Sequence, residues 1–172
     1  MIAYITGGSK GIGYGIAEAV LSAGGKVAIT ARTLASAETA AKNLAEKYNS
    51  DDILPLASSV SELDSEQSAV AETIKKFCKI DLVVANAGIG KFGSIEDLSP
   101  EDWQTTIDTN LTGVFNTVKA TLDPLKISKG FLITISSLAG TNFFAGGAAY
   151  NASKFGLTGF TMLTTISPIS SI

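Results

Sequence analysis

The sequence predicts a doubly wound α/β fold, a parallel sheet with helices on both faces. Five short apolar runs alternate with longer stretches of helical periodicity. The runs are continuously apolar, as expected for strands that are buried on both faces. Strands are expected at 2–6, 26–30, 53–57, 81–85 and 131–136, and helices near 11–24, 35–48, 62–78 and 100–124. In such a fold, ligands bind at the carboxyl ends of the strands.

The first strand leads into a glycine-rich turn and then into an amphipathic helix. Gly7, Gly11 and Gly13 have the spacing G-x-x-x-G-x-G. Missing β-carbons allow a tight turn there and let a pyrophosphate approach the backbone N–H groups at the helix N-terminus. The turn therefore predicts a bound dinucleotide, although a glycine-rich turn of this kind also occurs as a plain loop.

The N-terminus of the fourth predicted helix is indicated by its capping residues. Ser99 is expected as its N-cap, with Pro100 at the first helical position and acidic residues in the first turn. Its expected apolar face consists of Ile107, Leu111, Val114, Phe115 and Val118.

Composition narrows the function classes. A chain of 172 residues with 45% hydrophobic and 17% charged content predicts one globular domain over residues 1–172. The net charge of −3 and scattered basic residues indicate no nucleic-acid partner and no anionic membrane surface. No apolar run is long enough to span a bilayer and no signal peptide is evident, so a cytoplasmic location is expected.

Cysteine and histidine usage limits the chemistry. The absence of histidine excludes a Ser-His-Asp triad and every zinc site that needs imidazole, and no metal is expected. Cys78 is the single cysteine, and its place near Ile74 and Phe77 predicts a packed thiol.

Three residues near the end of the chain form a candidate catalytic set. Tyr150 and Lys154 are four residues apart, so on a helix they share one face, where an ammonium group can make a phenol more acidic. Ser137 follows the last predicted strand, where its hydroxyl can reach a substrate oxygen. An exposed i, i+4 pair on an amphipathic helix is the alternative interpretation of Tyr150 and Lys154.

Taken together, five features resemble the short-chain dehydrogenase/reductase (SDR) family over nearly the whole chain. They are the turn at 6–13, Asn86-Ala87-Gly88, Asn110, Ser137 and Tyr150-x-x-x-Lys154. The resemblance implies a Rossmann fold in which a single domain carries both the cofactor site and the catalytic site.

The resemblance also implies catalytic roles. Tyr150 would be the general acid that protonates a carbonyl oxygen and the base in the reverse direction, and Lys154 would also hold the nicotinamide ribose. Ser137 would bind the substrate oxygen. Asn110 resembles the family's asparagine that perturbs the helix and positions a water for proton relay, whereas a solvated or locally bonded side chain is the alternative.

Cofactor choice is read at the end of the second strand, where an acidic residue would favour NAD(H). This chain has Ala31 and then Arg32, and Lys10 adds a second cation, so NADP(H) is expected over NAD(H). Ser59 stands where many relatives carry an aspartate that contacts adenine. The expected cofactor-binding residues are Gly7, Ser9, Lys10, Gly11, Ile12, Gly13, Arg32, Thr33, Ser59, Val60, Asn86, Ala87, Gly88, Tyr150 and Lys154.

The expected function is NADPH-dependent hydride transfer to a carbonyl or from a secondary alcohol. A 3-oxoacyl thioester or another ketone is the expected substrate, with acyl-carrier protein as a further partner and a homo-oligomer, tetramer or dimer, as the assembly. A non-catalytic NADP(H)-binding regulator or a truncated SDR-like protein is the alternative. Family members continue past Ile172, so the C-terminal part of the fold is expected to be missing, and the tail 163–168 resembles the family's sixth strand.

Overall fold

The computed structural model describes residues 1–163, so the predicted sixth strand lies almost wholly outside the described residues. The chain forms two compact units. The first, called the sheet unit, comprises Met1–Gly88 and Thr112–Ile135. The second, called the α4/α6 unit, comprises Ile89–Leu111 and, among the described residues, 136–163.

The sheet unit contains five parallel strands in the order β3-β2-β1-β4-β5. This order reverses direction at β1, which is the doubly wound arrangement that the sequence predicts. The strands agree with the predicted ones to within one or two residues. Their bounds are Ile2–Ile5 for β1, Lys26–Ala31 for β2, Ile53–Ala57 for β3, Leu82–Ala85 for β4 and Phe131–Thr134 for β5.

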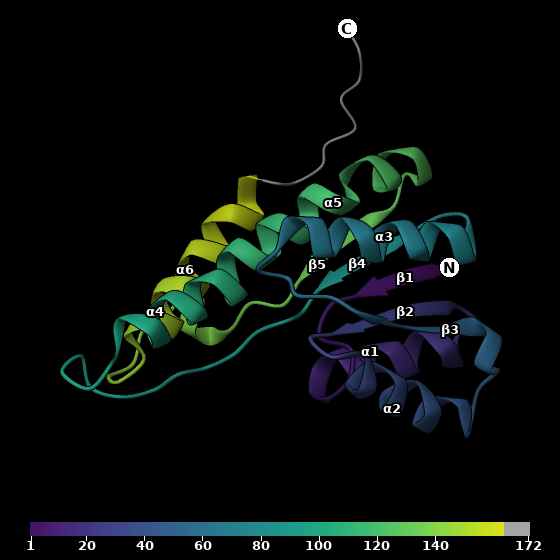
Figure 1. Ribbon diagram of the computed structural model, residues 1–172. Coiled ribbons are helices and arrows are strands. Elements are labelled where there is room, and N and C mark those ends of the chain that lie inside the picture. The colour runs from purple at the N-terminus through teal and green to yellow at the C-terminus, as the bar shows by residue number, and fades with distance from the viewer. Residues whose placement is uncertain (164–172) are drawn as a thin grey trace, which may run out of the picture. The chain divides into compact units, whose positions relative to one another are not determined.

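Helices cover both faces of this sheet (Figure 1). On one face, α1 (Gly11–Ser22) and α2 (Leu34–Ala45) pack on alternate strand residues such as Ile5 and Ile29. On the other face, α3 (Leu63–Phe77) and α5 (Gly113–Ser128) pack on the intervening residues, of which Tyr4 is one. Successive side chains along a strand therefore pack into two separate cores, one on each face of the sheet, as the continuous apolar runs predict.

A buried carboxyl group lies beside the core on the face of the sheet that α3 and α5 cover. Glu66 in α3 is fully buried and accepts hydrogen bonds from the hydroxyls of Tyr4 (3.2 Å), Thr117 (2.9 Å) and Ser58. Burial raises the pKa of the Glu66 carboxyl, although the three hydroxyl donors partly offset that effect. Burial and the nearby carboxyl also raise the pKa of Tyr4 well above its ordinary value.

The predicted fourth helix begins as expected but is not continuous. The Ser99 hydroxyl accepts a hydrogen bond from the Asp102 N–H at 3.0 Å, and α4 spans Pro100–Ile107. A π-helical segment at Asp108–Thr112 then separates α4 from α5. A π turn holds an extra residue, so the residues after it lie about 100° out of phase with a continuous α-helix. Of the predicted apolar face after this segment, Val114 and Val118 are buried, whereas Phe115 is 49% exposed, so its predicted place on that face is wrong.

Two further predictions are wrong in detail. Cys78 is exposed because the chain turns left-handed there (φ +69°) to end α3, which carries the thiol away from the packed face. On β5, Phe131 and Ile133 are 75% and 46% exposed, so this edge strand is not buried on both faces.

In the α4/α6 unit, α6 (Ala148–Leu163) packs against α4 and against a 3-10 turn at Leu138–Gly140. A second 3-10 turn, Ser50–Asp52, precedes β3 in the sheet unit. Within the part of the chain that the structure describes, no helix is long and apolar enough to cross a membrane.

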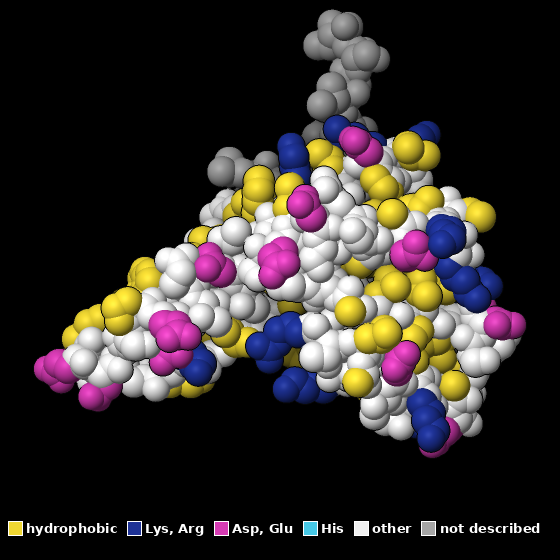
Figure 2. Space-filling view, viewed as in Figure 1, with side chains coloured by type: hydrophobic (Ala, Val, Ile, Leu, Met, Phe, Trp, Pro, Cys, Tyr) yellow, Lys and Arg dark blue, Asp and Glu magenta, His cyan; other side chains and the backbone are white. Residues whose placement is uncertain are grey.

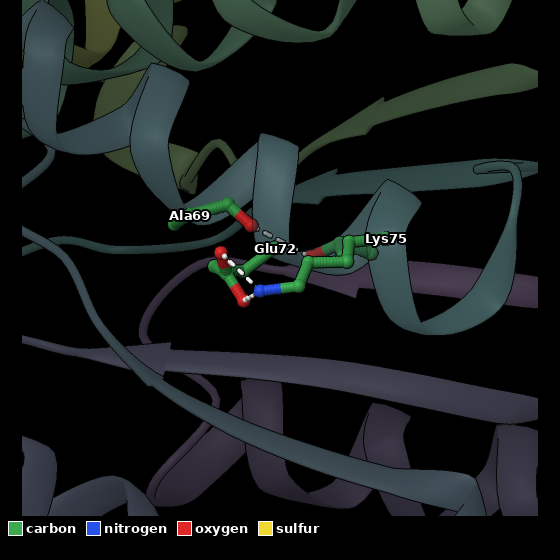
Figure 3. A network of polar contacts seen from close by, with 4 residues as sticks. Ala69, Glu72 and Lys75 are labelled. Atoms are coloured by element: carbon green, nitrogen blue, oxygen red, sulfur yellow. Dashed lines mark hydrogen bonds and ion pairs between the residues drawn. The ribbon is translucent and has the colours of Figure 1, made fainter.

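Charged side chains of both signs are scattered over the face shown in Figure 2. A representative pair lies on α3, where Lys75 Nζ is 3.2 Å from both carboxylate oxygens of Glu72 (Figure 3). Such exposed pairs contribute at most about 1 kcal/mol.

Candidate active site

The glycine turn between β1 and α1 depends on three glycines for two different reasons. Gly7 and Gly11 have φ of +62° and +58°, a left-handed conformation that a side chain disfavours. Gly13 has ordinary helical geometry, but a β-carbon there would lie 2.5 Å from Asn86 Nδ2 and 2.7 Å from the Gly7 carbonyl oxygen. The turn therefore brings the backbone close to α1, as a phosphate-binding turn requires.

The N-terminus of α1 has the chemistry of an anion site. Lys10 is the N-cap residue, and its side chain makes no capping hydrogen bond. The first turn of α1 contains no acidic residue. The first N–H groups of a helix lack partners within it and carry partial positive charge. These N–H groups and the exposed Lys10 ammonium fit a pyrophosphate, so the residues present suit a dinucleotide.

Asn86, which follows β4, and Thr6, which follows β1, hold this turn in place. The Thr6 hydroxyl oxygen accepts hydrogen bonds from the Asn86 and Ala87 N–H groups at 3.0 and 3.1 Å. The Asn86 Nδ2 donates to the carbonyl oxygens of Thr6 (2.9 Å) and Gly7 (3.1 Å). The Asn86-Ala87-Gly88 motif therefore fixes the glycine turn through hydrogen bonds.

The end of β2 leads to an open depression beside α2. Arg32 is exposed, and Thr33 caps α2 by accepting a hydrogen bond from the Ser36 N–H at 3.4 Å. The depression has a volume of about 380 Å³. It is lined by Ser9, Lys10, Ala35, Ser36, Thr39, Ala40 and Asn43. Of the lining residues on α2, which were not predicted from sequence, Ser36 and Thr39 carry hydroxyl groups on the first two turns of the helix, and that pattern was the available signal.

Ser59 and Val60 follow β3 and are held by the surrounding chain. The Ser59 N–H donates to the Ser65 hydroxyl at 3.0 Å, and the Val60 carbonyl oxygen accepts from Asn116 Nδ2 at 2.9 Å. Ser59 is half-buried and Val60 is buried.

Tyr150 and Lys154 lie on one face of α6, as their spacing predicts. The Lys154 ammonium nitrogen is 5.8 Å from the centre of the Tyr150 ring. Lys154 is only 5% exposed, and burial lowers the pKa of its ammonium group. The pair is therefore not a solvated surface pair, which removes the alternative interpretation from sequence.

Ser137 begins the 3-10 turn that packs on α6. Its hydroxyl oxygen accepts a hydrogen bond from the Ala139 N–H at 3.1 Å, which leaves the hydroxyl proton available for donation. A β-carbon on Gly140 would lie 2.8 Å from the Lys154 carbonyl oxygen and 2.6 Å from the Thr158 hydroxyl. Glycine at position 140 therefore lets the turn that carries Ser137 approach the helix that carries Lys154.

Asn110 sits in the π segment and is fully buried. Its Oδ1 accepts from the Ile89 N–H, and its Nδ2 donates to the Ile89 carbonyl oxygen, both at 2.8 Å. Nδ2 also donates to the Ser153 hydroxyl at 3.0 Å. Sequence reasoning missed Ser153, a buried residue inside the Tyr-Asn-Ala-Ser-Lys stretch. Its position between Tyr150 and Lys154 was the signal from which it could have been found.

The four candidate catalytic residues, Asn110, Ser137, Tyr150 and Lys154, all belong to the α4/α6 unit. The candidate cofactor residues up to Gly88 all belong to the sheet unit. Among the described residues, no cluster of three or more acidic or cysteine side chains is arranged to hold a metal ion.

Comparison with known proteins finds relatives along nearly the whole chain. The model of the short chain dehydrogenase family matches residues 1–166. The chain is 35% identical over 159 residues to 3-oxoacyl-(acyl-carrier-protein) reductase FabG of Chlamydia muridarum, covering 92% of this chain and 64% of the relative. It is 36% identical over 168 residues to trans-4-hydroxycyclohexanecarboxylate dehydrogenase of Sinomonas cyclohexanicum, covering 93% of this chain and 63% of the relative. The chain thus spans somewhat less than two thirds of the length of these relatives.

Solved structures agree. An alcohol dehydrogenase from Thermococcus sibiricus, complexed with 5-hydroxy-NADP, superposes with a TM-score of 0.89 at 32% identity, covering 96% of this chain and 70% of that one. A 3-ketoacyl-ACP reductase from Sinorhizobium meliloti gives a TM-score of 0.86 at 35% identity, covering 93% and 64%. With the motifs, the parallel sheet and these relatives in agreement, the chain belongs to the short chain dehydrogenase family.

Proposed function

We propose that this protein is an NADP(H)-dependent oxidoreductase that interconverts a carbonyl compound and a secondary alcohol. The observation that carries the proposal is the arrangement on α6, where a buried Lys154 ammonium lies 5.8 Å from the Tyr150 ring. In this proposal the sheet unit binds the dinucleotide and the α4/α6 unit supplies the groups that handle the proton. The single-domain organisation that the sequence predicts remains part of the proposal.

The sheet unit supports NADP(H) as the cofactor. The α1 N-terminus and the glycine turn suit the pyrophosphate, while Lys10 and Arg32 offer two cations for a 2′-phosphate. The Thermococcus sibiricus structure, which contains an NADP derivative, supports the same choice by similarity. When bound, the reduced nicotinamide would supply a hydride to the carbonyl carbon.

The residues of the α4/α6 unit would manage the charge that develops on the carbonyl oxygen. Ser137 donates its hydroxyl proton in a hydrogen bond to that oxygen, and Tyr150 transfers its phenolic proton to it. The new O–H bond replaces the O–H bond of Tyr150, so the proton that leaves the phenol is the one that the alcohol gains. Lys154 stabilises the resulting phenolate by its charge.

Asn110 would act as a positioning residue in this reaction. Its amide ties Ile89 to Ser153, which lies between Tyr150 and Lys154 in sequence. The two Nδ2 hydrogens are engaged in these bonds. The proposed role of Asn110 is therefore to hold α6 in place beside the π segment.

The names of the relatives suggest the substrate class. Several are 3-oxoacyl-(acyl-carrier-protein) reductases, so a 3-oxoacyl thioester or another ketone is the proposed substrate, and acyl-carrier protein is a proposed partner. We also propose a homo-oligomer, which sedimentation of the intact protein would test.

The test is consumption of NADPH and NADH by the intact protein with 3-oxoacyl thioesters and simple ketones. We expect turnover with NADPH, and we expect Tyr150→Phe to lower kcat at least 100-fold while NADPH binding is retained. Tyr48→Phe on the sheet unit is the matched control and should leave kcat unchanged. NADPH binding without turnover of any carbonyl would refute the catalytic proposal and favour a regulatory protein.

A further inference from the structure

Three aromatic rings of the α4/α6 unit form a cluster that includes the proposed catalytic residue. The ring centroids of Phe92 and Tyr150 are 5.4 Å apart in an edge-to-face arrangement. Phe144 completes the cluster, with its ring centre 5.8 Å from that of Phe92 and 6.5 Å from that of Tyr150. These separations fall in the range where aromatic pairs attract one another.

Two glycines make room for the two phenylalanine rings. A β-carbon on Gly90 would lie 2.5 Å from the Phe92 ring, and one on Gly147 would lie 2.6 Å from the Phe144 ring. Neither glycine has a positive φ, so the backbone at both positions would accept alanine. What these glycines provide is therefore space for the rings.

The loops that carry the rings are tied to each other and to α6. The Gly93 N–H donates to the Gly146 carbonyl oxygen at 2.9 Å, which joins the two loops. Asn151, the residue after Tyr150, donates through Nδ2 to the Phe144 carbonyl oxygen at 2.8 Å. The cluster is thus fixed to the first turn of the helix that carries Tyr150.

The cluster leaves much apolar surface open although its rings contact one another. Phe92 is 63% exposed and Phe144 is 45% exposed. The surroundings of the cluster offer few unpaired charges to a ligand. The described residues 136–163 contain Lys154 as their only charged side chain. In the loop that carries Phe92, Lys91 is paired with Asp102 at 3.1 Å, Asp97 accepts a hydrogen bond from the Ser94 hydroxyl at 2.7 Å, and Glu96 is the remaining charged residue. An open aromatic surface with few charges favours an uncharged apolar group.

We propose that Phe92 and Phe144 bind a cyclic apolar group attached to the substrate carbonyl, and that they thereby select ketones with a bulky aromatic or alicyclic substituent. This inference rests on the proposed function, because it places the substituent beside the carbonyl oxygen that Tyr150 would protonate. Contact with Tyr150 limits how far from the carbonyl the group can be attached. The two phenylalanines are specificity residues that touch the substrate and take no part in proton transfer.

Two ketones that differ mainly in the substituent test the proposal. The measured quantity is the ratio of kcat/KM for cyclohexyl methyl ketone to kcat/KM for 2-butanone, with NADPH and the intact protein. We expect Phe92→Leu and Phe144→Leu each to lower this ratio about fivefold to tenfold, chiefly through KM for the cyclic ketone. Phe143→Leu, in the same loop and 83% exposed, is the matched control and should leave the ratio unchanged.

The glycines give a second, independent test. Gly90→Ala should lower the ratio by displacing the Phe92 ring, but it should have no further effect in a Phe92→Leu background. Gly159→Ala on α6, where a β-carbon would meet no atom within 4 Å, controls for the general effect of such a change. Thermal unfolding of each variant shows whether it is folded, and Gly90→Ala remains informative if Phe92→Leu is not.

Three outcomes have distinct meanings. A ratio that falls in the Phe92 and Phe144 variants and in Gly90→Ala, but not in the controls, supports the proposal. A ratio that stays constant, or a loss of kcat that is equal for both ketones, overturns it while the proposed function stands. Failure of the unmodified protein to reduce any carbonyl with either cofactor refutes the proposed function itself.

Discussion

Asn110 and Ser153 are joined by a hydrogen bond of 3.0 Å in which the buried amide Nδ2 donates to the serine hydroxyl. Asn110 lies in the π segment and Ser153 lies on α6, immediately before Lys154. The Ser153 hydroxyl in turn donates to the Tyr150 carbonyl oxygen at 2.8 Å. The bond therefore links the irregular part of the long helix to the backbone of the proposed catalytic pair.

Removing the Ser153 hydroxyl should affect both stability and the site. In Ser153→Ala, one N–H of the buried Asn110 amide loses its acceptor, which costs about 1 to 3 kcal/mol of unfolding free energy. Urea unfolding measures this loss, and Ser68→Ala on the exposed side of α3 is the control. We also expect a lower kcat at an unchanged KM for NADPH. Full stability in Ser153→Ala would show that Asn110 has found another partner.

The glycine turn provides a matched pair of variants on one helix. Gly13→Ala places a methyl group 2.5 Å from Asn86 Nδ2 and 2.7 Å from a backbone oxygen, so the turn must shift. Gly15→Ala meets nothing within 4 Å and should stabilise α1 by up to about 1 kcal/mol. Melting temperature and NADPH affinity should therefore both fall in Gly13→Ala, while neither falls in Gly15→Ala. Equal behaviour of the two variants would contradict the tight approach of the turn to α1.

Cofactor preference should depend on two cations. Lys10→Ala and Arg32→Ala are each expected to weaken NADPH binding about tenfold to 100-fold, because each would remove a proposed charged partner of the 2′-phosphate. NADH binding should change little. Titration of both cofactors by fluorescence measures the difference, with Lys42→Ala on α2 as the control. If the affinities for NADPH and NADH fall equally, these side chains do not bind the 2′-phosphate.

The buried carboxyl of Glu66 should make stability fall as pH rises. Burial raises the folded-state pKa of Glu66 above its unfolded value, so its contribution is fully present below about pH 4.5 and is lost as pH rises through the folded pKa. Each pKa unit of elevation corresponds to about 1.4 kcal/mol. Urea unfolding from pH 4 to pH 8 measures the slope.

Glu66→Gln should flatten this pH dependence without disturbing the fold. A glutamine oxygen can accept from Tyr4 and Ser58, and its Nε2 can donate to Thr117, whose hydroxyl also lies 2.9 Å from the Gly113 carbonyl oxygen. Glu72→Gln, on the exposed pair of Figure 3, is the control and should keep the slope of the unmodified protein. A Glu66→Gln slope equal to that of the control would mean that the carboxyl is ionised at little cost.

The sequence predicted the parts of this structure that depend on local pattern. The five strands, the glycine turn, the Ser99 cap and the shared helical face of Tyr150 and Lys154 all follow from spacing over a few residues, and the structure confirms them. For the π segment, the only indication in the sequence was the resemblance at Asn110, which implied a perturbed helix there. No periodicity marks an inserted residue, so the break at Asp108–Thr112 in the predicted continuous helix could not be read from the pattern.

Contacts between distant side chains could not be predicted in this way. The bond from Asn110 to Ser153 joins residues 43 positions apart, and the space that Gly90 leaves for Phe92 depends on how a loop folds back. The exposed Cys78 results from a left-handed residue at the end of α3, although its neighbours suggested a packed face. These outcomes are decided by backbone conformation and tertiary packing rather than by a repeat in the sequence.

The hydroxyl groups around Glu66 have a consequence for how this chain tolerates change. Replacing Glu66 with leucine would leave the buried Tyr4 hydroxyl beside an apolar group, which would be destabilising. The Thr117 hydroxyl would keep its bond to the Gly113 carbonyl oxygen, and the Ser58 hydroxyl would keep the Ser65 hydroxyl at 3.4 Å. Replacing Tyr4 and Glu66 together with apolar residues of similar shape can be nearly neutral. These two positions are therefore mutually dependent, and related sequences should carry both polar side chains or neither.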